Sequence, residues 1–204
     1  TRPGAERVSE AEEIERTIPV IAELAMHGVK ISIDTMRAST AEVAIKAGAS
    51  IINDVSGGLA DPHMLQTAAR LGVPYIAMHW RGQSKDMNSK AIYSDVVIDV
   101  ISELQERITA ALDAGIEVGN LIIDPGLGFA KDAEHNWEII DSIDSFVDLG
   151  YPVLVGASRK RFLGGDSPDE REQATIDLTK RLATTGVWAV RVHSVKPHKE
   201  VLAQ

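Results

Sequence analysis

The stretch "NLIIDPGLGF" at residues 120–129 decides how the fold is predicted. It begins as a continuous apolar run, which indicates a strand buried on both faces, as in a parallel sheet covered by helices. The run ends at Asp124, and Pro125 and Gly126 behind it predict a turn. A buried carboxylate destabilises a protein unless a partner compensates its charge. We therefore expect either an internal partner for Asp124 or a ligand that supplies one.

Strand-like and helix-like segments alternate along the whole chain. Short segments rich in β-branched residues recur at residues 29–35, 49–57, 74–80, 120–126, 151–158 and 187–194. Helical patterns occupy residues 9–28, 37–47, 61–72, 97–115, 137–143 and 170–185. In the first of these, Ser9 and Glu12 predict a capping box, and Pro19 should kink or split the helix. The alternation indicates one parallel α/β domain, residues 1–204.

Two parallel α/β folds fit this alternation, the doubly wound sheet and the (β/α)8 barrel. No G-x-G-x-x-G follows a strand, so the dinucleotide-binding version of the doubly wound sheet loses its main support. Polar residues instead end nearly every predicted strand: Asp34, Asn53, His79, Asp124, Ser158 with Lys160, and Arg191 with His193. Strand ends build the active sites of TIM barrels, which have eight strands. The predicted fold is therefore a (β/α)8 TIM barrel that lacks its first two βα units in this chain.

The composition excludes several classes of protein. The chain has 204 residues, of which 44% are hydrophobic and 25% charged, so disorder and collagen-like structure are excluded. The formal net charge is −9 and no long basic run occurs, so we expect no nucleic-acid partner. No apolar stretch reaches the roughly 18 residues that a bilayer requires, so we expect no membrane association. The absence of cysteine fits a reducing compartment, and we expect a cytoplasmic protein.

Four strand-end residues form a first candidate site: Asp34, Asn53, Asp124 and Lys160. Two carboxylates, one amide and one cation suit a flat heterocycle with an amino-pyrimidinone edge, because its NH groups would face the carboxylates and its carbonyl the lysine. Such a ligand would supply the partner that Asp124 needs. The alternative for each aspartate is a helix cap or a salt bridge with a neighbouring lysine.

A second candidate site is cationic, and it lies in "SRKR" at residues 158–161 and "RVH" at residues 191–193. Alternation along a strand places Arg191 and His193 on one face, where they would bind an anion, most naturally phosphate. The alternatives are a solvated basic loop and a histidine of the core. The six histidines have no zinc-site spacing, so we expect no protein metal site, and any metal would be a hard ion such as Mg²⁺ that arrives with a phosphorylated substrate. The "GAS" at residues 156–158 also lacks the spacing of a hydrolase nucleophile.

Six motifs, in this order, resemble the dihydropteroate synthase family: "TRPG" at 1–4, "SIDT" at 32–35, "INDVSG" at 52–57, "DPGLGFAK" at 124–131, "GASRKRF" at 156–162 and "RVH" at 191–193. The set is far more specific than any one motif, and it spans nearly the whole chain. The resemblance implies a (β/α)8 barrel of the folate pathway. Its enzymes join 6-hydroxymethyl-7,8-dihydropterin pyrophosphate to p-aminobenzoate and release pyrophosphate in the presence of Mg²⁺. Sulfonamides mimic the aminobenzoate, and members of the family are homodimers.

The resemblance also implies roles for individual residues. Its pterin pocket corresponds to Asp34, Asn53, Met78, Asp124, Gly156 and Lys160, of which Asp34, Asp124 and Lys160 are the implied catalytic residues. The implied pyrophosphate anchors are Arg191, His193 and Arg2. The implied p-aminobenzoate residues are Thr1, Arg2, Pro3, Phe129 and Ser158. The two aspartates would stabilise a delocalised pterin cation while the basic residues and Mg²⁺ stabilise the departing pyrophosphate.

Two departures from the family and two rival functions accompany this hypothesis. The family's first strand, whose Asn helps to hold Mg²⁺, has no counterpart in the chain, and Ser194 follows His193 where the family usually has Asp. One rival is the pterin-binding domain of corrinoid-dependent methyltransferases, which binds no pyrophosphate. The other is a non-catalytic barrel that binds pterin or serves as a scaffold. An apolar stripe at Ile176, Leu182 and Val187 would suit either a dimer interface or the core.

Overall fold

The structure is a computed structural model, and it describes residues 7–83 and 87–203. Within these residues six short strands follow one another in a single parallel order. β1 (Ser32–Asp34), β2 (Ile51–Asp54), β3 (Tyr75–Met78) and β4 (Leu121–Asp124) form one sheet, and β5 (Leu154–Val155) pairs with β6 (Ala189–Val190). A parallel bridge between Ile123 and Val153 joins the two sheets. The six strands predicted from the sequence are therefore confirmed in number and order, although each is shorter than its apolar segment.

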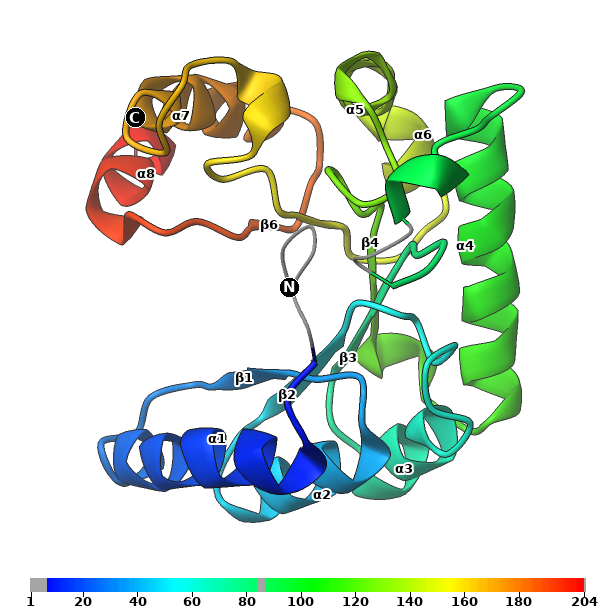
Figure 1. Cartoon of the computed structure of the whole chain (residues 1–204), viewed down its shortest axis with the longest axis vertical. Coiled ribbons are helices and arrows are strands. Elements are labelled where there is room, and N and C mark those ends of the chain that lie inside the picture. Colours follow the sequence, from blue (N-terminus) through cyan, green and yellow to red (C-terminus); the bar gives the residue numbers. More distant parts are fainter. Residues whose placement is uncertain (1–6, 84–86, 204) are drawn as a thin grey trace.

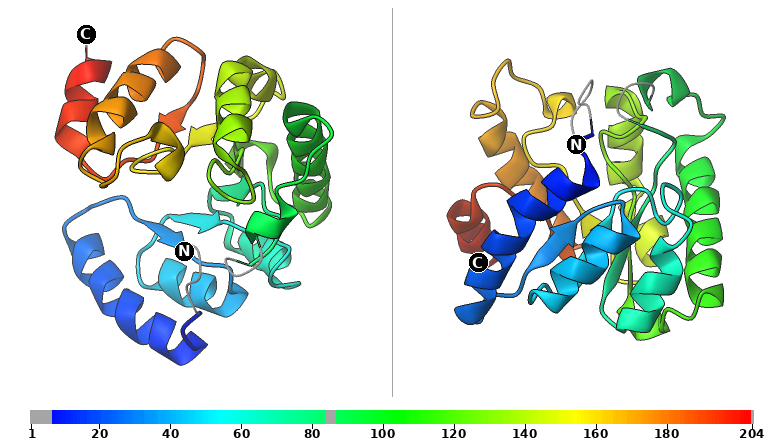
Figure 2. Two further views of the ribbon diagram at one scale, coloured as in Figure 1. Left: turned by 45° about the horizontal axis from the view of Figure 1, so that its top comes forward. Right: turned by 60° about the horizontal axis from the view of Figure 1, so that its bottom comes forward.

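Helices lie between the strands, as the alternating pattern predicts, and cover the outer side of the sheet (Figures 1 and 2). The α-helices are α1 (Glu10–Met26), α2 (Ala38–Lys46), α3 (Met64–Leu71), α4 (Val96–Asp113), α5 (Ala133–Asp141), α6 (Ile143–Val147), α7 (Arg171–Leu182) and α8 (Val195–Leu202). Three 3-10 helices complete the set: η1 (Met87–Lys90), η2 (Val118–Asn120) and η3 (Arg161–Leu163). In the described part of the chain, no helix has the length and apolar character needed to cross a membrane.

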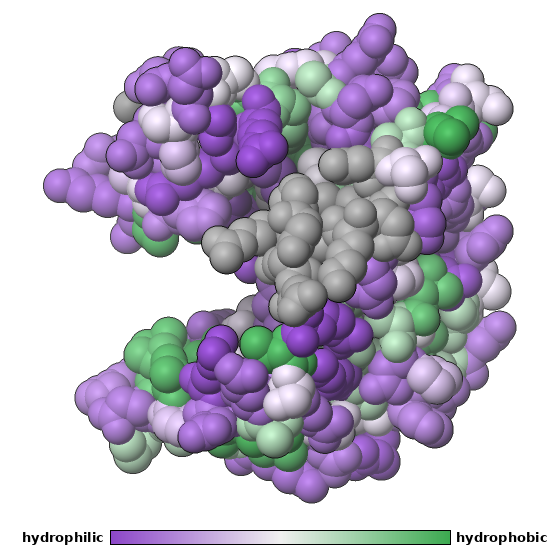
Figure 3. Space-filling view, viewed as in Figure 1, coloured by the Kyte–Doolittle hydropathy of each residue, from purple (hydrophilic) through white to green (hydrophobic). Residues whose placement is uncertain are grey.

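The strands and helices form an open arc instead of a closed barrel. β1 lies at one edge of the arc and β6 at the other, and a wide gap separates them (Figure 1). The space-filling view shows a notch at the same place, between the part that carries α1 and the part that carries α7 and α8 (Figure 3). This arrangement agrees with the predicted barrel without its first two βα units, because two further strands would lie between β6 and β1.

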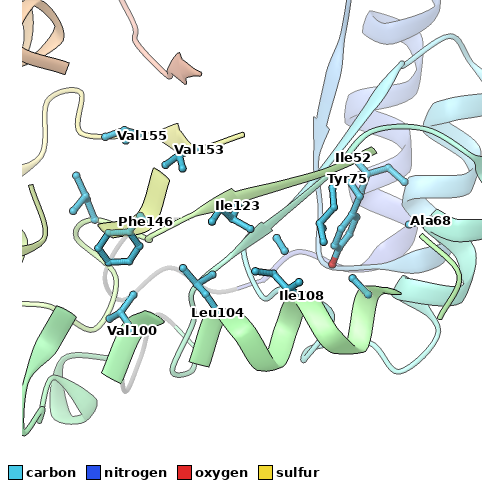
Figure 4. Close-up of a cluster of buried hydrophobic side chains, with 14 of the residues drawn as sticks. Ile52, Ala68, Tyr75, Val100, Leu104, Ile108, Ile123, Phe146, Val153 and Val155 are labelled. Atoms are coloured by element: carbon cyan, nitrogen blue, oxygen red, sulfur yellow. The ribbon is translucent and has the colours of Figure 1, made fainter. Parts of the chain in front are cut away.

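Side chains on opposite faces of the strands have different partners, because successive residues of a strand point to opposite sides. On the outer face, Ile123 and Val153 belong to the main hydrophobic core between sheet and helices. Val100, Leu104 and Ile108 of α4 pack against this core (Figure 4). A second, smaller cluster lies on the inner face of the arc and contains Ile76, Ile122 and Leu154, with Ile51 and Ala189 packed against them.

Two predictions about α1 need correction: Pro19 does not split the helix, and the capping box is incomplete. α1 is continuous from Glu10 to Met26 although Pro19 lies inside it. Pro19 is exposed, so water can reach the carbonyl group that loses its hydrogen bond. Ser9 caps α1 by accepting from the Glu12 backbone N–H, but the Glu12 side chain pairs with Arg16 instead of completing a capping box.

The C-terminal third of the chain also differs from the prediction. The fifth predicted helix is two helices, α5 and α6, and α8 was not predicted at all, because its sequence contains Pro197 and too few apolar residues for a clear pattern. The apolar stripe that suited either a dimer interface or the core lies partly in the core, since Leu182 is buried and Val187 packs against the same cluster.

Candidate active site

A layer of polar and small residues lies directly above the inner hydrophobic cluster. Each strand residue of that cluster is followed, two positions later, by a predicted site residue on the same face. The five pairs are Ile51 with Asn53, Ile76 with Met78, Ile122 with Asp124, Leu154 with Gly156, and Ala189 with Arg191. The strand period therefore brings these residues to one end of the arc, as the barrel prediction requires.

The backbone register places the same residues on neighbouring strands. Asp34 at the end of β1 is opposite Asn53 of β2, and Met78 of β3 is opposite Asp124 of β4. The backbone N–H of Arg191 donates to the carbonyl of Val155 next to Gly156, at 2.9 Å. The predicted pterin-pocket residues on the strands are therefore close together in the structure.

Asp124 is the most buried carboxylate of this layer, with 7% of its surface exposed. Its Oδ1 atom accepts from the backbone N–H of Gly126, at 2.7 Å. Burial raises the pKa of Asp124, while the charges of Lys160, Lys131 and Arg191 and the bond from Gly126 oppose that rise. Three positive charges thus favour the ionised form of Asp124. They supply part of the internal compensation that a buried carboxylate requires.

Gly126 makes the turn behind Asp124 possible. Its φ is 69°, and a Cβ atom there would lie 2.4 Å from the carbonyl oxygen of His79. A side chain would therefore clash with the backbone of the neighbouring strand, and the left-handed conformation also favours glycine. The "DPG" of the sequence is thus required for the Asp124 side chain to be held by the following backbone amide.

Asn53 lies on β2, next to the paired strands β3 and β4, and β4 ends at Asp124. One hydrogen-bonding atom of the Asn53 side chain is unused. It is 6% exposed, and its Oδ1 atom is buried without a hydrogen-bond partner among the residues that the structure describes. Buried polar atoms of folded proteins are nearly always paired, so an orphaned acceptor in a strand-end layer indicates a place for a donor from a ligand. Asn53 is in this respect the site residue whose environment is least complete without a ligand.

Lys160 reaches the same layer from the loop after β5. Its Nζ donates to the carbonyl of Leu127 and lies 4.9 Å from the centre of the Phe129 ring. Burial lowers the pKa of Lys160 to about 8, and the charge of Asp124 opposes that shift. Lys160 thus interacts with both Asp124, a predicted pterin-pocket residue, and Phe129, one of the predicted p-aminobenzoate residues.

Arg191 and His193, the basic residues of the second candidate site, contact different partners. Arg191 is exposed and pairs with Asp34 across the opening of the arc, with Nη2 2.8 Å from Oδ2. His193 is also exposed, and its Nδ1 lies 2.9 Å from Oγ of the buried Ser158. Both basic side chains therefore lie at the predicted end of the sheet, each beside another predicted site residue.

Some residues at or near the site differ from the sequence prediction. His79 follows Ala77 on the outer face of β3 and contacts helix α4, so it is not part of the inner layer. Arg159, which sequence analysis did not single out, has a φ of 61° and donates to Ser194 Oγ at 3.2 Å, which connects the loops after β5 and β6. Thr1, Arg2 and Pro3 lie outside the described residues.

Lys131 is a second residue that the sequence argument missed as a functional candidate. It is buried and donates to the carbonyls of Gly126 and Phe129, at 3.2 and 3.1 Å. The signal was present in "DPGLGFAK", because a lysine two residues beyond an aromatic residue of a predicted site loop is close enough to bind that loop. Its burial could not be read from the sequence.

Among residues 7–83 and 87–203, no group of three or more histidine or acidic side chains is placed to hold a metal ion. The carboxylates of the inner layer, Asp34 and Asp124, instead face arginine and lysine charges. The described residues therefore offer no cluster of three acidic or histidine ligands for Mg²⁺.

Comparison with known proteins identifies the family. Residues 1–193 match the family described as pterin binding enzyme. The dihydropteroate synthase of Mycobacterium leprae is 45% identical over 212 residues, which cover 99% of this chain and 75% of the relative. The solved structure of Yersinia pestis dihydropteroate synthase in a sulfonamide drug complex has a TM-score of 0.95 and 35% identity, and the match covers 99% of this chain and 74% of that one.

A further solved structure, Xanthomonas albilineans dihydropteroate synthase in complex with 7,8-dihydropteroate, has a TM-score of 0.90 and 36% identity, covering 98% of this chain and 75% of that one. Sequence and backbone thus agree over almost the whole chain, which spans about three quarters of the relatives' length. The chain belongs to the pterin-binding enzyme family and, within it, to the dihydropteroate synthases.

Proposed function

We propose that the protein joins 6-hydroxymethyl-7,8-dihydropterin pyrophosphate to p-aminobenzoate, which gives dihydropteroate and pyrophosphate. The observation that carries this function is the pair of buried acceptors Asn53 Oδ1 and Asp124, which lie in one layer beside the Lys160 cation. Asn53 Oδ1 has no partner among the described residues, and Asp124 accepts from the backbone N–H of Gly126 through one of its two oxygens. Both side chains therefore suit the NH and NH₂ groups of a pterin ring, and the lysine suits its carbonyl or ring nitrogen. The relatives named above carry the same activity in their names.

The reaction would be a substitution at the methylene carbon of the pterin. The bond between that carbon and the pyrophosphate oxygen breaks, and a bond to the amino nitrogen of p-aminobenzoate forms while that nitrogen loses a proton. The carboxylates Asp124 and Asp34 favour positive charge that develops on the pterin. Arg191 and His193 are at the same end of the sheet and would bind the departing pyrophosphate. No covalent bond to the protein is needed.

The substrate p-aminobenzoate would lie on the side of Lys160 where Phe129 and Ser158 are found. We extend the proposal to sulfonamides as inhibitors there, since the Yersinia pestis relative is solved with such a drug. Mg²⁺ belongs to the proposal as an ion bound to the pyrophosphate of the substrate. The proposal also includes a homodimer, which rests on the family resemblance, and a cytoplasmic location, which rests on the absence of cysteine.

The main rival is the pterin-binding domain of a methyltransferase, which also binds a pterin but has no pyrophosphate to hold. Arg191 and His193 favour the synthase, because two exposed basic side chains at the strand ends suit a ligand that carries an anionic group. A non-catalytic pterin-binding scaffold would need the acceptors but not the basic residues.

A calorimetric titration tests this function. The protein is titrated with 6-hydroxymethylpterin pyrophosphate and Mg²⁺, and separately with the same pterin without its pyrophosphate. The synthase predicts tighter binding of the pyrophosphate form and formation of dihydropteroate when p-aminobenzoate is added. Equal binding of the two pterins without product would favour the methyltransferase or scaffold function, and binding of neither would contradict the assignment of the pocket.

A further inference from the structure

A chain of charged and polar groups, two of them buried, lies behind the site on the outer face of the sheet. It starts at Glu103 on α4, passes through His79 at the end of β3 and ends at Lys131 in the loop after β4. His79 is 1% exposed and Lys131 is 7% exposed. Neither side chain belongs to the inner layer, so their burial needs another explanation than substrate contact.

The ammonium group of Lys131 uses all three of its hydrogens. Its Nζ lies 2.8 Å from Nδ1 of His79, 3.2 Å from the carbonyl oxygen of Gly126 and 3.1 Å from that of Phe129. An ammonium has three donors and no acceptor, so these contacts match its capacity. Two of the three fix the loop that follows Asp124, one at each end of the segment from Gly126 to Phe129.

Glu103 determines which nitrogen of His79 carries the proton. Its Oε2 is 2.9 Å from Nε2 of His79, so that nitrogen donates and Nδ1 remains free to accept from Lys131. Burial lowers the pKa of His79 to about 4, with the charge of Lys131 as the next cause, so the ring is neutral. The guanidinium of Arg81 holds Glu103 in turn, with Nε 3.0 Å from Oε1.

We propose that Lys131 is a positioning residue for the synthase reaction: oriented by His79 and Glu103, it holds Phe129 for p-aminobenzoate and supplies positive charge behind Asp124. The inference rests on the function proposed above. According to this inference, residues on the outer face of the sheet hold in place the loop that forms part of the site on the inner face. The Gly126 N–H that bonds to Asp124 and the Phe129 ring beside Lys160 both belong to the segment that Lys131 holds.

The protonation of Lys131 depends on charges from every element around it. These are Asp124 on β4, Lys160 after β5, Arg81 after β3 and Glu103 on α4, with the neutral ring of His79 in contact. Burial lowers the pKa of Lys131 to about 7, and Asp124 and Glu103 oppose that shift. A neutral amine has two hydrogens for three acceptors, so Lys131 loses one of its three bonds, to the loop or to His79, as the pH rises through this value.

Steady-state kinetics with Lys131→Met test the inference. With the pterin substrate saturating, kcat/KM for p-aminobenzoate in the unmutated protein should fall as the pH rises through about 7. In Lys131→Met this fall should vanish, and the KM for p-aminobenzoate at low pH should rise about tenfold or more, because a misplaced binding group weakens a positioned complex. Lys46→Met is the matched control, since Lys46 is an exposed lysine paired with Glu42 on α2. It should leave both quantities unchanged.

Glu103→Gln is the second test, and it keeps the inference open to refutation if Lys131→Met does not fold. Glu103 raises the pKa of Lys131, so its neutralisation should move the alkaline fall of kcat/KM to lower pH. A folded Lys131→Met with the KM and pH profile of the unmutated protein would overturn the inference, and so would an unshifted profile in Glu103→Gln. If the unmutated protein makes no dihydropteroate at any pH, the proposed function itself fails.

Discussion

Arg191 and Asp34 form an ion pair across the opening of the arc, with Nη2 2.8 Å from Oδ2. One residue follows the strand at the β6 edge and the other ends the strand at the β1 edge, so the pair connects the two open sides at the site. Their side chains are 61% and 38% exposed, which makes the pair a weak contributor to stability. Each partner is also predicted to bind substrate, so we expect contacts with the ligand to replace the ion pair between Arg191 and Asp34.

The first prediction concerns this pair. Arg191→Ala should change the free energy of unfolding by less than about 1 kcal/mol, as for other exposed pairs, yet abolish the preference for pterin pyrophosphate over pterin. Arg181→Ala is the matched control, since Arg181 makes a 2.8 Å surface pair with Asp141 on α5. Urea unfolding and calorimetry measure the two effects. A preference that survives in Arg191→Ala would remove Arg191 from the anion site.

The second prediction concerns the buried carboxylate. Asp124→Asn should keep the fold and lower turnover by about 10²-fold or more, because the amide no longer stabilises positive charge on the pterin. The folded-state pKa of Asp124 is raised by burial, so its ionised form costs stability at neutral pH and this cost disappears as the pH falls.

Asp124→Asn should accordingly unfold at a higher urea concentration than the unmutated protein at pH 7, and the difference should shrink toward acid pH. Urea unfolding at several pH values, together with a turnover assay, checks both parts. Unchanged turnover would exclude Asp124 from the chemistry.

The third prediction uses the orphaned acceptor of Asn53. Asn53→Leu should increase the free energy of unfolding by about 1 kcal/mol, since a buried polar atom without a partner is costly, and should weaken pterin binding. Thr40→Val on α2 is the matched control, because Thr40 Oγ1 is also buried without a partner in the described part of the chain. It should stabilise the protein without altering pterin affinity. Equal pterin affinity in Asn53→Leu would show that Asn53 does not contact the ligand.

The fourth prediction concerns the loop after β2. Asp54 is fully buried and accepts from the Tyr75 hydroxyl at 2.8 Å and from Ser56 and Gly58 of the same loop. Tyr75→Phe should lower the free energy of unfolding by about 1.5–3 kcal/mol, the range for a hydrogen bond to a charged group. Tyr151→Phe, at a partly exposed tyrosine, should have a smaller effect. A loss as small as that of Tyr151→Phe would mean that the Asp54 carboxylate finds another donor.

Much of the fold and half of the site could be predicted from local patterns. The six apolar segments fixed the number and order of the strands, because a parallel strand buried on both faces needs a continuous apolar run. The polar residue at each strand end could be placed at one end of the sheet, because parallel strands all end on the same side. His79 was assigned to that layer wrongly, because a strand's apolar run does not show which of its last two residues points inward.

The sequence by itself determined the alternation of strands and helices, the strand-end layer of Asn53, Asp124 and Arg191, and the glycine turn behind Asp124. These depend on periodicity and on local backbone sterics, which are properties of neighbouring residues. The tertiary structure decided what each charge faces. Lys131 lies 52 residues from His79 in sequence, and Arg191 lies 157 from Asp34, yet each pair is 2.8 Å apart. Only the folded chain brings such groups together, and burial then determines their protonation and hence their chemistry.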